Sequence, residues 1–372
     1  MVAYNLSLRW NHSSRVDLID ARRSRYRHVD TSKPPMLTPP PLSTDAILAT
    51  VRQTNGLRIR EAVFLPIGLD VNAAVYRLMT EDGAPYFLKL KRGDFDDIGV
   101  AVPAFLRDCG IRQVMAPLAT TDHQLWTNAH GFDWILYPYF EGRDGYEAVL
   151  SDAQWVALGE CLRGVHAAIL PAPLKPHVPR EDFSPRWRDI VTAFDRQVDT
   201  RTYDDPVAAR LAAFWIEKRD EIRALVARAT HLARVLRDQP GDFVLCHGDM
   251  HPGNILLGAH DALAVVDWDS PVFAPREHDL MLLGGAMGFV MEGAREDALF
   301  YRGYGEVDID PVALAYYRHE RIVADVAAFG MQIFGAEGSV EDRECGLHIL
   351  MRQFLPGDHV VAAAHRTYAR LP

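Results

Sequence analysis

The chain carries the stretch His247-Gly248-Asp249-Met250-His251-Pro252-Gly253-Asn254, followed by Val265-Val266-Asp267-Trp268-Asp269. Asp249 and Asn254 lie five residues apart on a loop rich in glycine and proline, and Asp267 comes thirteen residues after Asn254, at the end of a β-rich run. Asp, Asn and Gly are typical turn residues, so each of them taken alone favours a polar turn between strands.

Together, the two carboxylates and the carboxamide suit phosphoryl transfer. That reaction needs a carboxylate that orients a hydroxyl and accepts its proton, and hard oxygen ligands that hold Mg²⁺ on the phosphates. The spacing of the set favours this chemistry over a turn, provided that the rest of the chain supplies a nucleotide site.

An antiparallel meander is expected over residues 62–90, where the hydrophobic period changes to two around a turn at 81–83. Lys89 stands on its third strand, and Lys91 shares the same face by alternation. We favour Lys89 as a phosphate-binding group because it lies within the apolar run; the alternative is a solvated strand lysine. Gly68, between the first two strands, suits either a loop over nucleotide phosphates or an ordinary hairpin turn.

Further elements follow from periodicity and capping residues. A helix opens at Ser43, another covers 98–109 with an interruption at Pro103, and β-like runs occupy 124–126 and 134–137. Beyond Gly142 the chain is mostly helical, with a short hairpin region inside. The helices are expected at 152–169, 185–198, 206–228, 277–289 and 311–334, and the hairpin region at 243–246 and 262–266.

These elements predict an α+β fold with two lobes: a small N-terminal antiparallel β lobe and a larger, mainly helical C-terminal lobe. The expected division is 36–140 for the nucleotide-binding lobe and 141–372 for the helical lobe with the catalytic loop and the substrate site. Residues 1–35 hold seven basic against three acidic residues, a net +4, and form a flexible basic extension. The extension resembles a transit peptide, and the alternative is that translation begins at Met36 and the extension is a start-site artefact.

Composition and charge limit the classes of partner that we expect this chain to bind. The 372 residues are 48% hydrophobic and 24% charged, as in globular proteins, and the formal net charge of −10 argues against a nucleic-acid partner. The four cysteines show no C-x-x-C spacing, and the sequence contains no apolar run long enough to span a bilayer. A cytoplasmic protein without a membrane partner is expected.

Over about residues 60–280, the order of meander with lysine, hinge strand, catalytic loop and metal aspartate resembles the aminoglycoside phosphotransferase and choline kinase family, which shares the protein-kinase fold. The resemblance implies ATP and Mg²⁺ as cofactors. It implies that Asp249 is the catalytic base, that Asn254 and Asp267 bind magnesium, and that Lys89 contacts the nucleotide phosphates. Asp279 is expected to anchor the catalytic loop through backbone amides.

The connector 136–142 resembles the family's hinge, where main-chain groups bind adenine. Matching the family's pattern back from Gly142 places the acceptor carbonyl at Pro138 and the donor amide at Phe140, and proline keeps its carbonyl. The alternative is a proline-interrupted edge strand. One feature departs from the family: the helix after the lysine strand should supply a glutamate partner, yet residues 94–100 offer only aspartates.

Four stretches, at 36–40, 86–91, 266–271 and 316–321, are similar to the spectinomycin phosphotransferase branch of the family. That branch implies phosphorylation of a hydroxyl on an aminocyclitol, a small, cationic, hydroxylated substrate. Carboxylates near the amines are then needed. The candidates are Asp269, Glu306, Asp308, Asp310, Glu320 and Asp325.

Two alternatives stay open. A kinase of a housekeeping amino alcohol or sugar, such as choline or homoserine, would carry the same catalytic segments. A catalytically silent nucleotide-binding regulator is supported by the missing helix glutamate alone.

Overall fold

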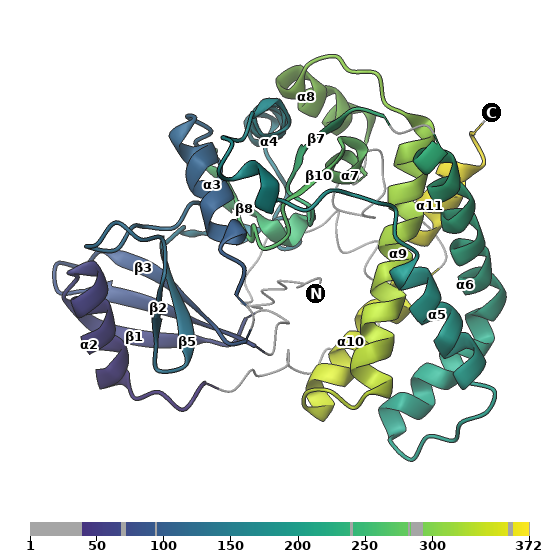
Figure 1. Cartoon of the computed structure of the whole chain (residues 1–372), viewed down its shortest axis with the longest axis horizontal. Helices are drawn as coiled ribbons and strands as arrows, with labels where there is room; N and C mark the ends of the chain where they lie inside the picture. Colours follow the sequence, from purple (N-terminus) through teal and green to yellow (C-terminus); the bar gives the residue numbers. More distant parts are fainter. Residues whose placement is uncertain are drawn as a thin grey trace, which may run out of the picture.

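The computed structural model describes residues 39–67, 72–93, 95–238, 241–281, 283, 293–355 and 360–371. An antiparallel sheet lies on one side of the molecule, and a larger, mainly helical part lies on the other (Figure 1). This arrangement confirms the predicted α+β architecture. The predicted extension 1–35 and Gly68 lie outside the described residues.

The sheet has five strands in the order β1-β2-β3-β5-β4, all antiparallel. The strands are β1 (Ile59–Leu65), β2 (Ala73–Thr80), β3 (Pro85–Lys91), β4 (Thr127–Ala129) and β5 (Phe132–Pro138). The meander is therefore as predicted. The fourth strand was predicted at 124–126 and lies three residues later, because His130 (φ 53°) and Gly131 (φ 76°) form a tight two-residue turn that fixes its pairing with β5.

Helix α2 (Thr44–Asn55) packs on this sheet, as the capping pattern predicted. The Ser43 side chain accepts the N–H of Ala46, and Gly56 ends the helix in the left-handed region at φ 69°. Ile47 and Val51 are buried against apolar side chains of β2, β3 and β5. The sheet and α2 therefore share one hydrophobic core.

Helix α3 (Ile98–Asp108) is continuous, and the predicted interruption at Pro103 is wrong. Proline inside a helix removes one backbone hydrogen bond. The buried side chains of Ile98, Val102 and Leu106, which join the core of the helical part, offset that loss.

The helical part contains the following elements: β6 (Gly142–Asp144), α4 (Asp152–Ala167), η2 (Lys175–His177), α5 (Arg186–Gln197), α6 (Pro206–Asp238), α7 (Glu277–Leu280), α8 (Ala294–Tyr304), α9 (Pro311–Phe334), α10 (Val340–Gln353) and α11 (Val360–Tyr368). Helices α4, α5 and α9 match the prediction within two residues, whereas α6 runs ten residues further. For the helix predicted at 277–289, the described residues show α7 alone. The elements α8, α10 and α11 were not predicted. No helix in the described ranges is both long and apolar enough to cross a membrane.

Four short strands surround the stretch 247–254: β7 (Phe243–Cys246), β8 (Ile255–Gly258), β9 (Leu263–Val265) and β10 (Val272–Pro275). The predicted hairpin region contains two separate pairings: β7 pairs with β10, whereas β9 pairs with β8. A third strand, β6, pairs with β8 on its other side. The loop after β7 is thereby held between two small sheets.

Candidate active site

Asp279 anchors the loop that follows β7. The carboxylate of Asp279 accepts the backbone N–H of His247 at 2.8 Å and that of Gly248 at 3.1 Å, as the sequence predicted. Gly248 has φ 83°, and a Cβ there would lie 1.8 Å from the carbonyl oxygen of Ser270. This position therefore requires glycine both for its backbone conformation and for space.

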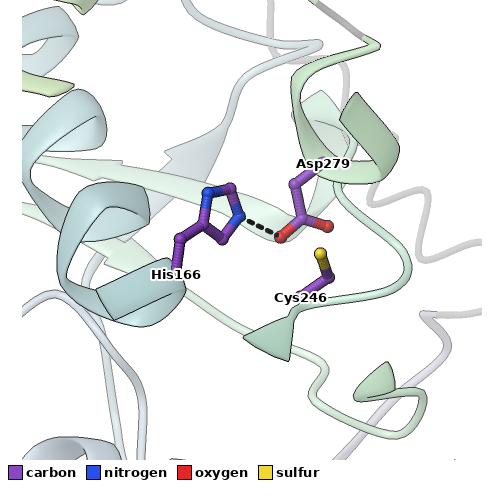
Figure 2. Close-up of side chains that lie close together, drawn as sticks. All are labelled: His166, Cys246 and Asp279. Atoms are coloured by element: carbon purple, nitrogen blue, oxygen red, sulfur yellow. Dashed lines mark hydrogen bonds and ion pairs between the residues drawn. The ribbon is translucent and has the colours of Figure 1, made fainter. Parts of the chain in front are cut away.

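Figure 2 shows Asp279 with His166 and Cys246, whose side chains lie close together. His166 Nε2 lies 3.1 Å from Asp279 Oδ2, and burial raises the pKa of the Cys246 thiol well above its usual value. Three side chains of these types are also a possible ligand set for a metal ion. Both oxygens of Asp279 already accept backbone N–H groups, so this carboxylate serves as an anchor for the loop.

Asp249 lies in this loop and is 5% exposed. Its Oδ1 accepts a hydrogen bond from Arg321 Nη1 at 2.7 Å, and its Oδ2 lies 3.8 Å from His251 Nε2. Burial works to raise the pKa of Asp249, but Arg321 and then His251 outweigh it and hold that pKa below its ordinary value. Asp249 is thus a buried carboxylate that stays ionised at neutral pH.

His251 lies two residues after Asp249 in the same loop and is fully buried. The structure shows that its Nδ1 accepts the backbone N–H of Gly253 at 3.0 Å. Burial lowers the pKa of His251 to about 4, so the ring is neutral at pH 7.

Asn254 and Asp267 are brought together by backbone hydrogen bonding between their segments. The Val266 N–H donates to the Asn254 carbonyl at 3.0 Å, and Asp267, at φ 64°, turns the chain directly afterwards. Asn254 Nδ2 donates to the Asp249 carbonyl at 2.8 Å, while Asn254 Oδ1 is buried and has no hydrogen-bond partner among the described residues. An orphaned amide oxygen beside a buried carboxylate is a donor set that fits Mg²⁺.

Lys89 projects from β3 to the same place. Its Nζ lies 2.9 Å from both Asp267 Oδ1 and Asp269 Oδ2, and Lys91 Nζ lies 2.9 Å from Asp269 Oδ2. Burial works to lower the pKa of Lys89, but Asp267 and Asp269 outweigh it and raise that pKa well above its usual value. Both lysines therefore face the site, and Lys89 is the one that also contacts Asp267.

Another residue takes the place of the glutamate that was expected on the helix after β3 as the partner of Lys89. Asp96 accepts the backbone N–H of Ile98 at the start of α3 instead of reaching Lys89. Asp269 supplies the acidic partner of Lys89. Asp269 also lies against α3: a Cβ added to Gly99 would be 3.3 Å from the Asp269 backbone and from its Oδ1. The lysine thus has its acidic partner on the segment after β9.

The hinge residues lie where β5 leaves the sheet. Pro138 is the last residue of β5 and is exposed, and Phe140 is half-buried. Strand β5 lies between β3 and β4, so it is not an edge strand. The adenine contacts assigned to Pro138 and Phe140 remain predictions.

The carboxylates considered for substrate amines are dispersed. Asp310 caps α9 by accepting the N–H of Val312, and Glu320 lies 3.6 Å from Arg188. Asp269 and Asp325 belong to the network around Lys89 and Arg321. Sequence reasoning assigned no role to Arg321, which is 72 residues away from Asp249 in the chain.

The sequence of this chain is similar to a known protein family and to a protein from Streptomyces griseus. The sequence profile of the phosphotransferase enzyme family matches residues 63–317. The protein StrN of Streptomyces griseus is 26% identical over 213 residues, a match that spans 54% of this chain and 63% of StrN.

Solved structures are similar to this chain over a larger part of its length. The crystal structure of spectinomycin phosphotransferase APH(9)-Ia in complex with ADP and spectinomycin is 33% identical, with a TM-score of 0.82 over 88% of this chain and 99% of that one. An aminoglycoside phosphotransferase from Alicyclobacillus acidocaldarius, 14% identical, shares the fold with a TM-score of 0.57 over 90% of this chain and 98% of that one. These matches confirm the protein-kinase-like fold that the sequence predicted. With the profile covering more than half of its length, this chain belongs to the phosphotransferase enzyme family.

Proposed function

We propose that this protein transfers the γ-phosphoryl group of ATP to a hydroxyl of an aminocyclitol of the spectinomycin type. The main support is the convergence of Asp249, Asn254, Asp267 and Lys89 on one site, in a chain 33% identical to a spectinomycin phosphotransferase along nearly that enzyme's whole length. A small molecule that is cationic and hydroxylated is the substrate class.

In this proposal Asp249 orients the acceptor. Its Oδ1 is held by Arg321, which leaves Oδ2 to accept a hydrogen bond from the substrate hydroxyl. A hydroxyl held in this way is aligned for in-line attack, and the carboxylate takes its proton late in the step. Because the carboxylate is a weak base, its contribution is mainly positional.

Lys89, Asn254 and Asp267 would hold the nucleotide. The Lys89 ammonium, now paired with Asp267, would move onto the phosphate oxygens when the nucleotide binds. Asn254 Oδ1 and the Asp267 carboxylate would hold Mg²⁺, which supplies charge neutralisation on the phosphates when bound. Adenine would bind the Pro138 carbonyl and the Phe140 amide, and Gly68 would lie over the phosphates.

The test is ADP release from ATP in the presence of Mg²⁺, with spectinomycin beside a panel of aminoglycosides, choline and homoserine. We expect stimulation by spectinomycin, a phosphorylated product by mass spectrometry, and loss of both in Asp249→Asn. An exposed matched control, Asp152→Asn, should keep wild-type turnover.

Other outcomes identify the alternatives. Stimulation by choline or homoserine alone would replace the aminocyclitol with a housekeeping acceptor. Nucleotide binding without transfer to any acceptor would contradict the proposal and indicate a regulator.

A further inference from the structure

We propose that Arg321 is a positioning residue for Asp249: by holding Oδ1, it turns Oδ2 toward the acceptor hydroxyl. This inference rests on the proposed function for the role of Asp249, while the ion pair itself is a property of the structure. Arg321 belongs to α9 and reaches the catalytic loop from another part of the chain.

The guanidinium is held from a second side. Arg321 Nε lies 3.2 Å from Asp325 Oδ1, one turn further along α9, and Asp325 Oδ2 accepts a hydrogen bond from Gln353 of α10 at 2.9 Å. The side chains of Arg321 and Asp325 are 10% and 3% exposed. A buried guanidinium that is hydrogen-bonded to one carboxylate and ion-paired with a second is restricted in orientation, so α9 and α10 set the direction in which the Asp249 carboxylate points.

Two histidines near Asp249, His251 and His278, do not supply a positive charge at neutral pH. Burial lowers the pKa of His251 to about 4, and it also lowers the pKa of His278. Tyr146, whose ring stacks on His251 at 6.0 Å, has its pKa raised by burial and is neutral. His247 uses Nδ1 to accept the Asp249 backbone N–H and Nε2 to contact the Val266 carbonyl.

Removal of Arg321 therefore frees the Asp249 carboxylate. The side chain loses the partner that fixes its rotamer, so Oδ2 is no longer held toward the acceptor hydroxyl.

The kinetic test compares Arg321→Gln and Arg321→Lys with wild type, using the acceptor that stimulates ADP release. For Arg321→Gln we expect kcat to fall more than tenfold and KM for ATP to change less than threefold. Arg321→Lys should restore part of kcat, because the ammonium keeps the charge but loses the fork geometry. The exposed control Arg210→Gln, which breaks a surface pair with Glu344, should leave both unchanged.

A purely structural role would lower the amount of folded enzyme without changing kcat per folded molecule. An unchanged kcat per folded molecule in Arg321→Gln, or a fall in kcat that Arg321→Lys does not relieve at all, would overturn the proposal. If Arg321→Gln does not fold, Asp325→Asn provides the second test, with a smaller fall in kcat expected in the same direction.

A second arm needs no acceptor. Urea midpoints of Arg321→Gln, Asp249→Asn and the double variant form a double-mutant cycle. We expect the double variant to be more stable than the sum of the single losses predicts, and additive losses would refute the pairing. If no acceptor stimulates wild-type ADP release, the proposed function fails, while this cycle still decides whether Arg321 holds Asp249.

Discussion

The substitution Asp279→Asn tests directly how the loop 247–254 is anchored. The side chain is 1% exposed and accepts the N–H groups of His247 and Gly248 as well as a contact from His166 (Figure 2). Asparagine has nearly the same shape but only one acceptor oxygen. Its NH₂ would face a backbone N–H, so one buried donor would be left without a partner.

The magnitude follows from the pKa of Asp279. Burial works to raise this pKa, but the hydrogen bond and charge of His166 and the charges of His278 and His247 outweigh it and lower the pKa from 3.8 to about 2. A gap of this size corresponds to roughly 2 kcal/mol of unfolding free energy. Since the folded-state pKa is the lower one, this stabilisation is complete above about pH 4 and is lost as the pH falls toward 2. With the orphaned donor added, the expected loss at pH 7 is about 2–4 kcal/mol.

Urea unfolding followed by tryptophan fluorescence measures this difference at pH 7, 4 and 3. The difference in unfolding free energy between wild type and Asp279→Asn should stay nearly constant from pH 7 to 4. At pH 3, about half of the part that depends on the ionisation of Asp279 should remain. The exposed control Asp152→Asn, which breaks a surface pair with Arg295, should cost less than about 1 kcal/mol. A variant as stable as wild type at pH 7, or a gap of the same size at pH 7 and pH 3, would refute the reasoning.

Three further predictions concern separate parts of the molecule. Lys89→Met should weaken Mg·ATP binding about tenfold or more by calorimetry, and Lys91→Met should weaken it less, because Lys89 contacts both Asp267 and Asp269; the reverse ranking would contradict the assignment. Gly303→Ala would place a Cβ 2.0 Å from the Val156 carbonyl where α8 crosses α4, so it should cost about 1–3 kcal/mol, and an unchanged thermal midpoint would refute this packing. Burial raises the pKa of Glu320 to about 7, so wild type should lose up to roughly 3 kcal/mol as the pH rises from 4.5 past 7, and Glu320→Gln should not; parallel urea midpoints at pH 5 and 8.5 would exclude this effect.

The placement of Asp249, Asn254 and Asp267 close together was predictable because the information for it is local. Asp249, Asn254 and Asp267 lie within nineteen residues of one another, and loop and turn chemistry fixes their relation. Lys89 followed from strand alternation, although alternation could not separate it from Lys91. The contact with Asp267 separates the two and depends on the way the sheet faces the helical part.

Other features depend on contacts between distant segments. Arg321 reaches Asp249 from α9, and Asp269 takes the place of a helix glutamate, so no spacing rule could assign either pair. Helix α10 is different, because a local signal was present: Ser339 and Asp342 form a reciprocal cap at its start. The strand pairing of β7 with β10 was missed because both β9 and β10 follow β7 closely and sequence alone does not choose between them.

If the proposed function is correct, the charges of the site favour a cationic acceptor. Lys89 and Lys91 face Asp267 and Asp269, while Arg321 bridges Asp249 and Asp325, so three cations are paired with four carboxylates. Buried charges are tolerated only when they are compensated. Mg·ATP would add negative charge when it binds, and the lysines that it engages would no longer neutralise their carboxylates. In the proposed reaction a dicationic acceptor would supply the missing positive charge next to Asp249, whereas a neutral polyol would leave the excess uncompensated. The proposal therefore predicts that the acceptor binds after the nucleotide.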